Sequence, residues 1–359
     1  MELLDQGCAL LRAQARVVLG KPWDTAPLSD EETRTLATAL TPLSEALNTT
    51  AATAPYLQDP ATRAAYVVGM APRTLAAVLH ELPPLPVGAR VLDLGAGTGA
   101  GALACVLSGA AHVALVDHAP DALASAKELL GHAGLSDVTP YNFRLDTWLN
   151  PLRRIQFDLV LMAFSLLEAA GDDVTRATAL LVKAERFVSE GGHILVVDSA
   201  QKSRARLINA LREPLMEAGF HLWAPCPHSA ACPALERERD FCHAARPWGL
   251  PDDVAQVGER AGLHRHRLAY SFLLVGRNPR PSAPPPVRVI GDVRREKGRA
   301  RVAVCAEGPV RELVALQRDR ATFEALQELP RGAGLRVKVP VDAERTLRVV
   351  DPGELTEVP

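Results

Sequence analysis

A glycine-rich segment at residues 90–101, with the sequence RVLDLGAGTGAG, constrains the fold of this chain more than any other feature. The apolar run Val91–Leu94 predicts a buried strand, and residues 102–107 predict the start of a helix. Glycines between them allow a sharp turn and let a ligand approach the backbone where a Cβ atom would collide. The segment therefore predicts a strand, a loop and a helix that together hold a cofactor.

The spacing of these glycines fits two classes of cofactor. Gly95, Gly97 and Ala100 satisfy the G-x-G-x-x-G/A pattern of dinucleotide-binding proteins. Asp93 lies two residues before Gly95, and a buried carboxylate there suits a cofactor with an amino group and a sulfonium but repels a pyrophosphate. The D-x-G-x-G-x-G pattern, which Gly99 completes, resembles the first motif of class I S-adenosylmethionine-dependent methyltransferases. S-adenosylmethionine is the favoured cofactor; a dinucleotide and a glycine turn without a ligand are the alternatives.

From Gly88 onward, short apolar strands alternate with helices, which predicts a Rossmann-like, mostly parallel sheet covered on both faces. The strand at 112–117 ends at Asp117, in a position where an acid accepts hydrogen bonds from ribose hydroxyls. Capping of the helix that begins near Pro120 is the alternative role. Asp146, at the end of the third strand, is predicted either to bind the adenine amino group or to cap the next turn.

A fourth strand at 157–162 should deliver residues 163–165 to the cofactor cleft at the carboxyl edge of the sheet. Neither an Asn/Asp-Pro-Pro-Tyr/Phe sequence nor a Pro-Cys dipeptide follows this strand. Amino-nitrogen base methylation and cysteine-nucleophile cytosine methylation therefore have no support. The catalytic residues are unknown, and methyl transfer from a sulfonium can proceed largely by positioning. The remaining core is predicted as a helix at 173–188, a turn at 191–192, a strand at 193–198 and a helix at 204–218.

The segments on either side of this core have different patterns. Residues 1–85 predict a helical N-terminal lobe, in which Ser29–Glu32 forms a good helix start. The core is expected at 86–280, with a cysteine-rich insert at 225–250. After a proline-rich linker, residues 287–359 predict a small β module, OB-like in its short strands. Its strands are expected at 287–290, 300–305, 310–316, 335–339 and 347–350.

The net charge is only −2, but cationic residues gather at the start of this module. Eight basic residues and two acids lie between positions 277 and 301. This run is interpreted either as a segment that contacts RNA or phosphate or as a solvent-exposed linker. No apolar run is long enough to span a membrane, and the N-terminus lacks the basic start of a signal peptide, so a cytoplasmic protein is expected.

Four of the six cysteines form a pattern that indicates a metal or cluster site. Cys226, Cys232 and Cys242 follow C-x5-C-x9-C in the insert, two of them beside proline, and 62 further residues separate Cys242 from Cys305. In a reducing compartment such a set favours metal over disulfides. The C-x2-C pairs typical of zinc are absent, whereas irregular spacing with prolines suits a [4Fe-4S] cluster.

Zinc is the second choice for this site, and reduced structural thiols are the third. Two histidines of the insert, His228 and His243, are possible zinc ligands and equally possible donors from outside the ligand set.

The insert and its flanks resemble those of the mitochondrial small-ribosomal-subunit assembly methyltransferase-like family and its bacterial homologues. The resemblance rests on Ala224–His228, Cys232–Pro233 and Phe241–His243, and it extends over roughly residues 60–310. It implies a class I methyltransferase fold and contact with small-subunit ribosomal RNA or a pre-ribosomal particle during assembly. It also implies that four cysteines hold a [4Fe-4S] cluster, and these map onto Cys226, Cys232, Cys242 and Cys305.

One segment departs from the family. A Glu-Pro-Gly-Thr-Pro-like run typically follows the fifth strand, whereas this chain has Asp-Ser-Ala-Gln-Lys at 198–202. Either a different acceptor pocket or a weakened or lost methylation is therefore expected.

Two functions remain in view. The first is an RNA methyltransferase whose cluster holds the insert against the C-terminal tail to form an RNA surface, the chain being a monomer off the ribosome. The second is a non-catalytic assembly factor that uses the fold as an RNA-binding platform. Radical chemistry is discounted, because four protein thiolates leave no open iron. The predicted cofactor-binding residues are Asp93, Gly95, Gly97 and Gly99 for the methionine end, Asp117 for the ribose and Asp146 for the adenine.

Overall fold

The computed structural model describes residues 2–48, 57–145, 152, 155–263, 267–280, 287–337, 346–349 and 351–358. The chain divides into two compact units. The first comprises Met1–Ala169, Lys183–Val197 and Trp248–Leu268, and the second comprises Ala170–Val182, Asp198–Pro247 and Ala269–Pro359. No helix within the described ranges is long and apolar enough to cross a membrane.

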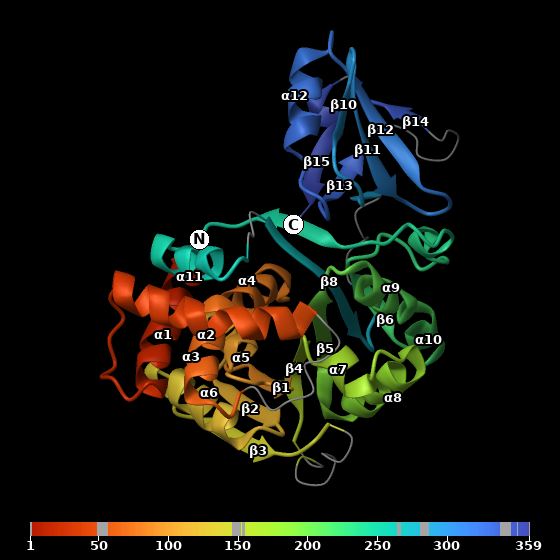
Figure 1. Cartoon of the computed structure of the whole chain (residues 1–359). Helices are drawn as coiled ribbons and strands as arrows, with labels where there is room; N and C mark the ends of the chain where they lie inside the picture. The colour runs from red at the N-terminus through yellow and green to blue at the C-terminus, as the bar shows by residue number, and fades with distance from the viewer. Residues whose placement is uncertain are drawn as a thin grey trace. The chain divides into compact units, whose positions relative to one another are not determined.

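A largely parallel sheet is the central element of the fold (Figure 1). Its strands are β1 (Arg90–Leu94), β2 (His112–Asp117), β3 (Val138–Asn142), β4 (Phe157–Ala163), β5 (Val188–Ser199), β6 (His221–Ala224), β7 (Ala244–Pro247) and β8 (Arg267–Gly276). In the described part of the chain they run in the order β3-β2-β1-β4-β5-β8-β6, and β7 also pairs with β8. Pairing is parallel from β3 through β5, whereas β6 is antiparallel to β8. This order confirms the predicted class I methyltransferase fold.

Strands β1, β2 and β4 consist mostly of buried apolar residues because helices cover both faces of a parallel sheet. Two of these helices are α5 (Ala100–Leu107), which follows the glycine loop, and α6 (Pro120–His132), which follows β2. Asp93 is the exception within β1, and it lies in register with Leu115 and Leu161 on the two neighbouring strands. A buried acid therefore stands at the carboxyl edge of the sheet, beside the loop.

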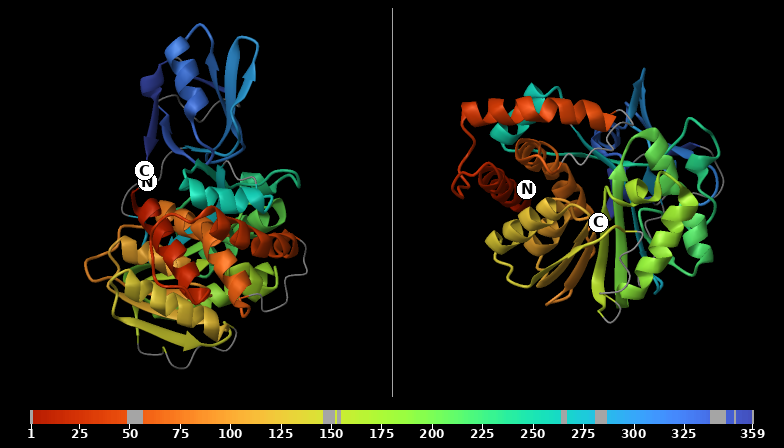
Figure 2. Two further views of the ribbon diagram at one scale, coloured as in Figure 1. Left: turned by 60° about the vertical axis from the view of Figure 1, so that its left-hand side comes forward. Right: turned by 60° about the horizontal axis from the view of Figure 1, so that its bottom comes forward.

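The first unit also contains the helical lobe (Figures 1 and 2). It consists of α1 (Glu2–Val18), α2 (Asp30–Asn48), α3 (Pro60–Gly69) and α4 (Ala71–Glu81), and α11 (Asp252–Arg260) packs against α2 and α3. The predicted helix start is confirmed: Ser29 N–H donates to Glu32 Oε2 at 2.9 Å, and Glu32 N–H donates to Ser29 Oγ at 3.2 Å. Helices α1 and α4 pack on α5, so the lobe is part of the same core as the sheet.

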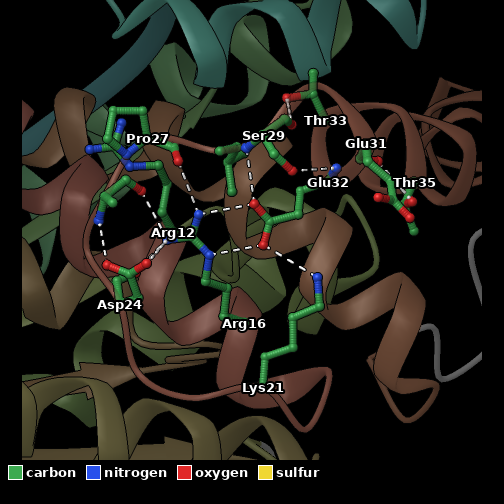
Figure 3. Close-up of polar contacts among 12 residues, drawn as sticks. Arg12, Arg16, Lys21, Asp24, Pro27, Ser29, Glu31, Glu32, Thr33 and Thr35 are labelled. Atoms are coloured by element: carbon green, nitrogen blue, oxygen red, sulfur yellow. Dashed lines mark hydrogen bonds and ion pairs between the residues drawn. The ribbon is translucent and has the colours of Figure 1, made fainter.

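Arg16 closes the corner between α1 and α2 (Figure 3). Its guanidinium is buried and donates to both carboxylate oxygens of Glu32, at 2.9 and 3.0 Å. It also donates to carbonyl oxygens of the connecting loop, among them that of Pro27 at 3.0 Å. The hydrogen bond from Arg16 holds the pKa of Glu32 well below its usual range. One buried arginine thus satisfies both the loop and the helix that follows it.

Three predicted features of the core differ from the structure. The helix predicted at 173–188 is α8 (Val174–Ala184), and β5 begins at Val188 and passes through the predicted turn at 191–192. β5 is irregular at this point, because Gly191 has a left-handed φ of +79° and the register with β4 shifts between Phe157 and Leu159. A Cβ atom at Gly192 would lie 3.0 Å from two carbonyl oxygens of β4, so glycine there also permits close strand approach. The helix predicted at 204–218 is two helices, α9 (Lys202–Ala210) and α10 (Arg212–Glu217). The short helix α7 spans Leu166–Ala170.

The C-terminal module lies within the second unit and contains more than the five predicted strands. Its elements are β9 (Val287–Val289), β10 (Arg294–Glu296), β11 (Arg299–Cys305), β12 (Arg311–Leu316), α12 (Arg320–Glu328), β13 (Gly334–Val337), β14 (Thr346–Arg348) and β15 (Leu355–Val358). The described strands form an open path, β14-β12-β11-β9-β13-β15, with β10 on β11, so an OB-like barrel is not confirmed. Helix α12 was not predicted. Phe323 and Leu326 suffice to pack it on the module core.

Candidate functional site

The glycine loop after β1 has left-handed backbone at three positions, with φ of +82° at Gly95, +51° at Gly97 and +86° at Gly99. A Cβ atom at Gly95 would lie 2.3 Å from the Cβ of Ser165, and one at Gly99 would lie 2.8 Å from that of Ala126. At Gly97 a Cβ atom would meet nothing within 4 Å. The outer glycines are therefore required by packing, and Gly97 borders open space that a ligand can enter.

Asp93 is buried at the base of the loop, with only 1% of its surface exposed. Its Oδ2 accepts a hydrogen bond of 3.0 Å from the N–H of Ala102 in the first turn of α5. Its Oδ1 is buried and has no hydrogen-bond partner. Burial raises the pKa of Asp93 to about 7, and the nearby charge of Asp117 acts in the same direction. The loop thus holds a carboxyl group that a cation would stabilise in its charged form.

Asp117 ends β2 and connects two turns. Its Oδ2 accepts a 2.8 Å hydrogen bond from Gly97 N–H, and its Oδ1 accepts one of 2.9 Å from Ala119 N–H. The second bond closes a turn just before α6, whose N-cap is Ala119, and no side chain caps that helix, so Asp117 supports the turn and is not itself the cap. The first bond was not anticipated, and it fixes the most open glycine of the loop. A carboxylate has further lone pairs, so these two bonds leave capacity for a ligand hydroxyl.

Further groups of the first unit gather near the loop. Ser165 donates to the carbonyl oxygen of Leu94 at 2.6 Å, and Phe164 beside it has a left-handed φ of +60°. The guanidinium of Arg73 lies 4.8 Å from the centre of the Phe164 ring. Burial raises the pKa of Tyr66 to about 12; the charges of Glu168 and Asp117 add to this rise, and Arg73 opposes it. Asp146 lies outside the described residues.

Residues 198–202, the segment that departs from the family, form a turn in the second unit that side-chain hydrogen bonds hold in place. Asp198, buried at the end of β5, accepts hydrogen bonds at 2.9 Å from Arg204 Nε and at 2.6 Å from Ser199 N–H. Ser199 Oγ in turn accepts one from Gln201 N–H at 3.1 Å. Polar side chains therefore build this turn into α9, without the proline of the family run.

The four cysteines predicted as ligands all lie in the second unit and are free thiols. Cys226 follows β6, Cys232 and Cys242 lie in the insert, and Cys305 ends β11. Burial raises the pKa of Cys226 to about 11 and that of Cys305 well above its ordinary value. The charges of Cys232 and Cys242 add to the rise at Cys226, and those of the other three cysteines add to the rise at Cys305, as expected of thiols that lie near one another.

In the described ranges, no group of three or more His, Cys, Asp or Glu side chains is arranged to hold a metal ion. His228 Nε2 is 3.3 Å from Cys305 Sγ, a hydrogen-bond contact that reaches from the insert to the C-terminal module. A second link between the same segments joins Ala245 N–H to the carbonyl oxygen of Arg331 at 2.9 Å. His243 stacks on Phe241, with ring centres 4.9 Å apart.

A buried arginine that the sequence reading missed lies among these thiols. Only 2% of Arg212 is exposed, and its Nη2 donates to the carbonyl oxygens of His228 at 2.9 Å and Ala230 at 3.0 Å. Its Nε and Nη1 are buried without a hydrogen-bond partner. The available signal was its place on an apolar helical stripe with Ile208 and Leu215, at spacings of four and three residues.

Arg288 is a second buried arginine near the set, with 5% of its surface exposed. Its Nε and Nη2 also have no hydrogen-bond partner, and its guanidinium lies 5.3 Å from the centre of the Phe272 ring. Residue 288 pairs directly with Cys305 across β9 and β11. In the described part of the chain, neither Arg212 nor Arg288 forms an ion pair with a carboxylate.

The structure divides the predicted basic run into three groups. Three of its arginines are used within the second unit, in hydrogen bonds or burial: Arg277, Arg280 and Arg288. Arg299 and Arg301 each pair with Glu296 at 2.6 Å. The other three cations are exposed on the β10–β11 hairpin: Arg294, Arg295 and Lys297. Within this run, the exposed basic side chains without an ion pair in the described residues thus lie on one hairpin.

Comparison with known proteins gives one family and a general fold. Residues 61–336 match the family model described as "Mitochondrial small ribosomal subunit Rsm22". A search of curated proteins finds no match.

Among solved structures, the chain is similar to ribosomal protein L11 methylase from Lactobacillus delbrueckii subsp. bulgaricus. The identity is 13% and the TM-score 0.35, over 58% of this chain and 78% of that one. It is also similar to precorrin-6y C5,15-methyltransferase from Geobacter metallireducens GS-15, at 14% identity and a TM-score of 0.37, over 57% and 86% of the two chains. Scores at this level carry no functional information about this chain.

Proposed function

The chain belongs to the mitochondrial small ribosomal subunit Rsm22 family, and we propose that it binds S-adenosylmethionine and methylates small-subunit ribosomal RNA during ribosome assembly. The observation that carries the proposal is the loop after β1, where Gly97 borders open space and buried Asp93 has an oxygen without a partner. Such a loop suits a small cofactor with a positively charged amino group. The family name supplies the ribosomal subunit as the partner.

The chain's own residues would bind and orient the cofactor, which supplies a methyl group on an already activated sulfonium. Asp93 and the three glycines of the loop would hold its methionine end. Asp117, which already fixes Gly97, would offer its remaining lone pairs to the ribose, and Asp146 is proposed for the adenine. No side chain is proposed as a catalytic base, because positioning against a sulfonium can carry most of the rate.

We also propose that the four cysteines hold a [4Fe-4S] cluster, with zinc as the second choice. The donors fit in kind, since thiolates are the ligands of such clusters. The surroundings fit in charge, since two arginines are buried beside the thiols without carboxylate partners. A cluster spaces its ligands more widely than one metal ion does, so the absence of a single-ion group in the described residues does not argue against it. The cluster would hold the insert to the C-terminal module.

The RNA-binding surface is proposed to include the β10–β11 hairpin. Arg294, Arg295 and Lys297 are exposed there, and in the described ranges none of them forms an ion pair. Lys and Arg side chains of this kind bind phosphates without reading sequence. The hairpin would therefore contribute affinity rather than the choice of nucleotide.

A non-catalytic assembly factor is the second candidate. The turn in which Asp198 binds Arg204 and Ser199 favours it, because polar side chains replace the run that family members have after the fifth strand. No acceptor-binding motif follows β4 either. In this reading the fold and its cofactor would serve only as a binding platform.

Transfer of a labelled methyl group separates the two candidates. The full chain is incubated with methyl-labelled S-adenosylmethionine and immature small-subunit particles, while calorimetry measures cofactor binding. The methyltransferase proposal requires label in the RNA, and Gly97→Ala should lower binding and labelling together. Tight binding without labelling would establish the non-catalytic candidate, and absence of binding would overturn the cofactor proposal itself.

Three further expectations remain predictions. Native mass spectrometry tests a monomer off the ribosome, fractionation of cells tests a cytoplasmic location, and limited proteolysis tests the domain limits near residues 86 and 287.

A further inference from the structure

We propose that Arg212, with Arg288 as its neighbour, is the buried countercharge of the metal-bound thiolate set and thereby controls how firmly the cluster is held and at what potential it is reduced. This inference rests on the proposed cluster. It concerns the arginines, which neither the family match nor the cysteine spacing identifies.

Burial is the first argument. A guanidinium at 2% exposure, with two nitrogens unsatisfied, has a high desolvation cost unless a negative charge lies beside it. No carboxylate of the described residues pairs with Arg212; its Nη2 donates to the carbonyl oxygens of His228 and Ala230, and its side chain also contacts the Cys232 thiol. The protein alone therefore leaves this cation without a full partner.

The thiols are the groups that can supply that partner. The carbonyl oxygens of His228 and Ala230, to which Arg212 Nη2 donates, belong to the loop between Cys226 and Cys232. The side chain of the same His228 contacts Cys305 Sγ at 3.3 Å, so the guanidinium is held at the loop that joins two of the thiols and reaches a third. Metal binding requires the thiolates and releases their protons. The negative charge beside Arg212 therefore arises when the thiols bind metal.

The amount of charge matches. A doubly positive [4Fe-4S] core with four thiolates is a dianion, and the two buried arginines supply two positive charges. Reduction adds one more negative charge, which a nearby guanidinium stabilises in a medium of low dielectric constant. Loss of that guanidinium should make the cluster harder to reduce and shift its potential to a more negative value.

The chain offers a matched control for the structural role of Arg212. Arg206, on the preceding helix α9, also clamps the insert, since its Nη1 donates to the carbonyl oxygens of Arg237 at 2.9 Å and Asp240 at 2.5 Å. No bond joins Arg206 to a thiol in the described structure. Arg206 and Arg212 therefore share the clamping of loops between the cysteines, but only Arg212 adds charge beside them.

The experiment uses the full chain purified anaerobically, with iron and acid-labile sulfide measured first and a spectroscopic redox titration second. Arg212→Gln removes the charge and keeps an amide donor, Arg212→Lys keeps the charge, and Arg206→Gln loosens the neighbouring loop. We expect Arg212→Gln to shift the potential to a more negative value or to lose iron severalfold faster to a chelator. Arg212→Lys and Arg206→Gln should stay near the wild type in both.

The outcomes separate this inference from the cluster proposal. Wild-type protein without iron would overturn the cluster, whatever the arginines do. A wild-type cluster whose potential and iron retention are the same in Arg212→Gln would overturn the countercharge and leave the cluster standing. If Arg212→Gln loses its cluster entirely, Arg212→Lys decides, because failure of the lysine variant to retain it would assign Arg212 a purely structural role.

Discussion

Ser165 Oγ donates a hydrogen bond of 2.6 Å to the carbonyl oxygen of Leu94, where β1 ends and the glycine loop begins. Ser165 also packs against Gly95, the residue after Leu94, since a Cβ atom at Gly95 would lie 2.3 Å from the Cβ of Ser165. Ser165, the second residue after β4, thus positions the turn that follows β1, through a bond between residues 71 positions apart in the chain. Ser165 thus contacts both residues at the start of the glycine loop, Leu94 through a hydrogen bond and Gly95 through packing.

Gly95→Ala should destabilise the protein by more than 2 kcal/mol, roughly the strain of a left-handed residue plus overpacking against Ser165. Gly109→Ala is the matched control. Its φ is +100° and a Cβ atom there would meet nothing within 4 Å, so only strain applies, at about 1 kcal/mol. Urea denaturation measures both. Equal losses for the two variants would show that Ser165 yields and that the contact at Gly95 is unimportant.

Gly97→Ala tests the open part of the loop. Because a Cβ atom at Gly97 meets no neighbour, the variant should lose only about 1 kcal/mol of stability, from its left-handed φ. Its affinity for S-adenosylmethionine should fall at least about tenfold, since the Cβ atom would occupy space proposed for the ligand. Calorimetry measures the affinity. Gly88→Ala, at a φ of +77° with equally open space, should leave binding unchanged.

Asp93 should make stability depend on pH. The pKa of Asp93 in the folded protein is about 7, above its ordinary value of 3.8. Protonated Asp93 therefore stabilises the folded state fully below pH 3.8, and this stabilisation is lost as the pH rises through 7. Asp93→Asn keeps an acceptor for Ala102 N–H and cannot ionise. As the pH rises from about 5 to 8, the free energy of unfolding of the variant should therefore increase relative to that of the wild type by a few kcal/mol. Parallel pH profiles of the two proteins would contradict the raised pKa.

Glu32→Gln should destabilise the helical lobe by about 2 to 3 kcal/mol, because it leaves the buried guanidinium of Arg16 without its carboxylate (Figure 3). The pKa of Glu32 is lowered by the hydrogen bond from Arg16, so this stabilisation is present above pH 4.5 and is lost as the pH falls below it. Thermal denaturation at two pH values measures both effects. Glu31→Gln changes an exposed neighbour and should cost less than about 0.5 kcal/mol.

Replacement of Arg295 and Lys297 together by glutamine should weaken RNA binding. The slope of the logarithm of the binding constant against the logarithm of the salt concentration should become shallower by about two, one for each phosphate contact removed. Fluorescence anisotropy across a salt series measures this with a small-subunit RNA fragment. Arg320→Gln is the control, since Arg320 is exposed but pairs with Glu324 at 2.9 Å on α12. If the double variant gave the same slope as Arg320→Gln, the hairpin would be excluded from the RNA surface.

Much of the fold could be predicted because local signals determine it. The apolar run before Asp93 and the glycines after it can form only a buried strand and a tight turn, and Ser29–Glu32 carries its own helix cap. The start of β5 was missed for the opposite reason. The glycine pair at 191–192 does break the register with β4, but the strand continues on both sides of the break because the neighbouring strand pairs with both parts.

The sequence by itself determined the fold class and the position of the glycine loop, because hydrophobic periodicity and glycine spacing are properties of short segments. Only the tertiary structure decided which groups surround them. Asp117 binds Gly97, Ser165 packs against Gly95, and Arg212 lies buried near thiols that come from the insert and from the end of β11. Contacts of this kind depend on how distant segments pack, and no local pattern encodes the burial that gives Asp93 and Arg212 their unusual electrostatics.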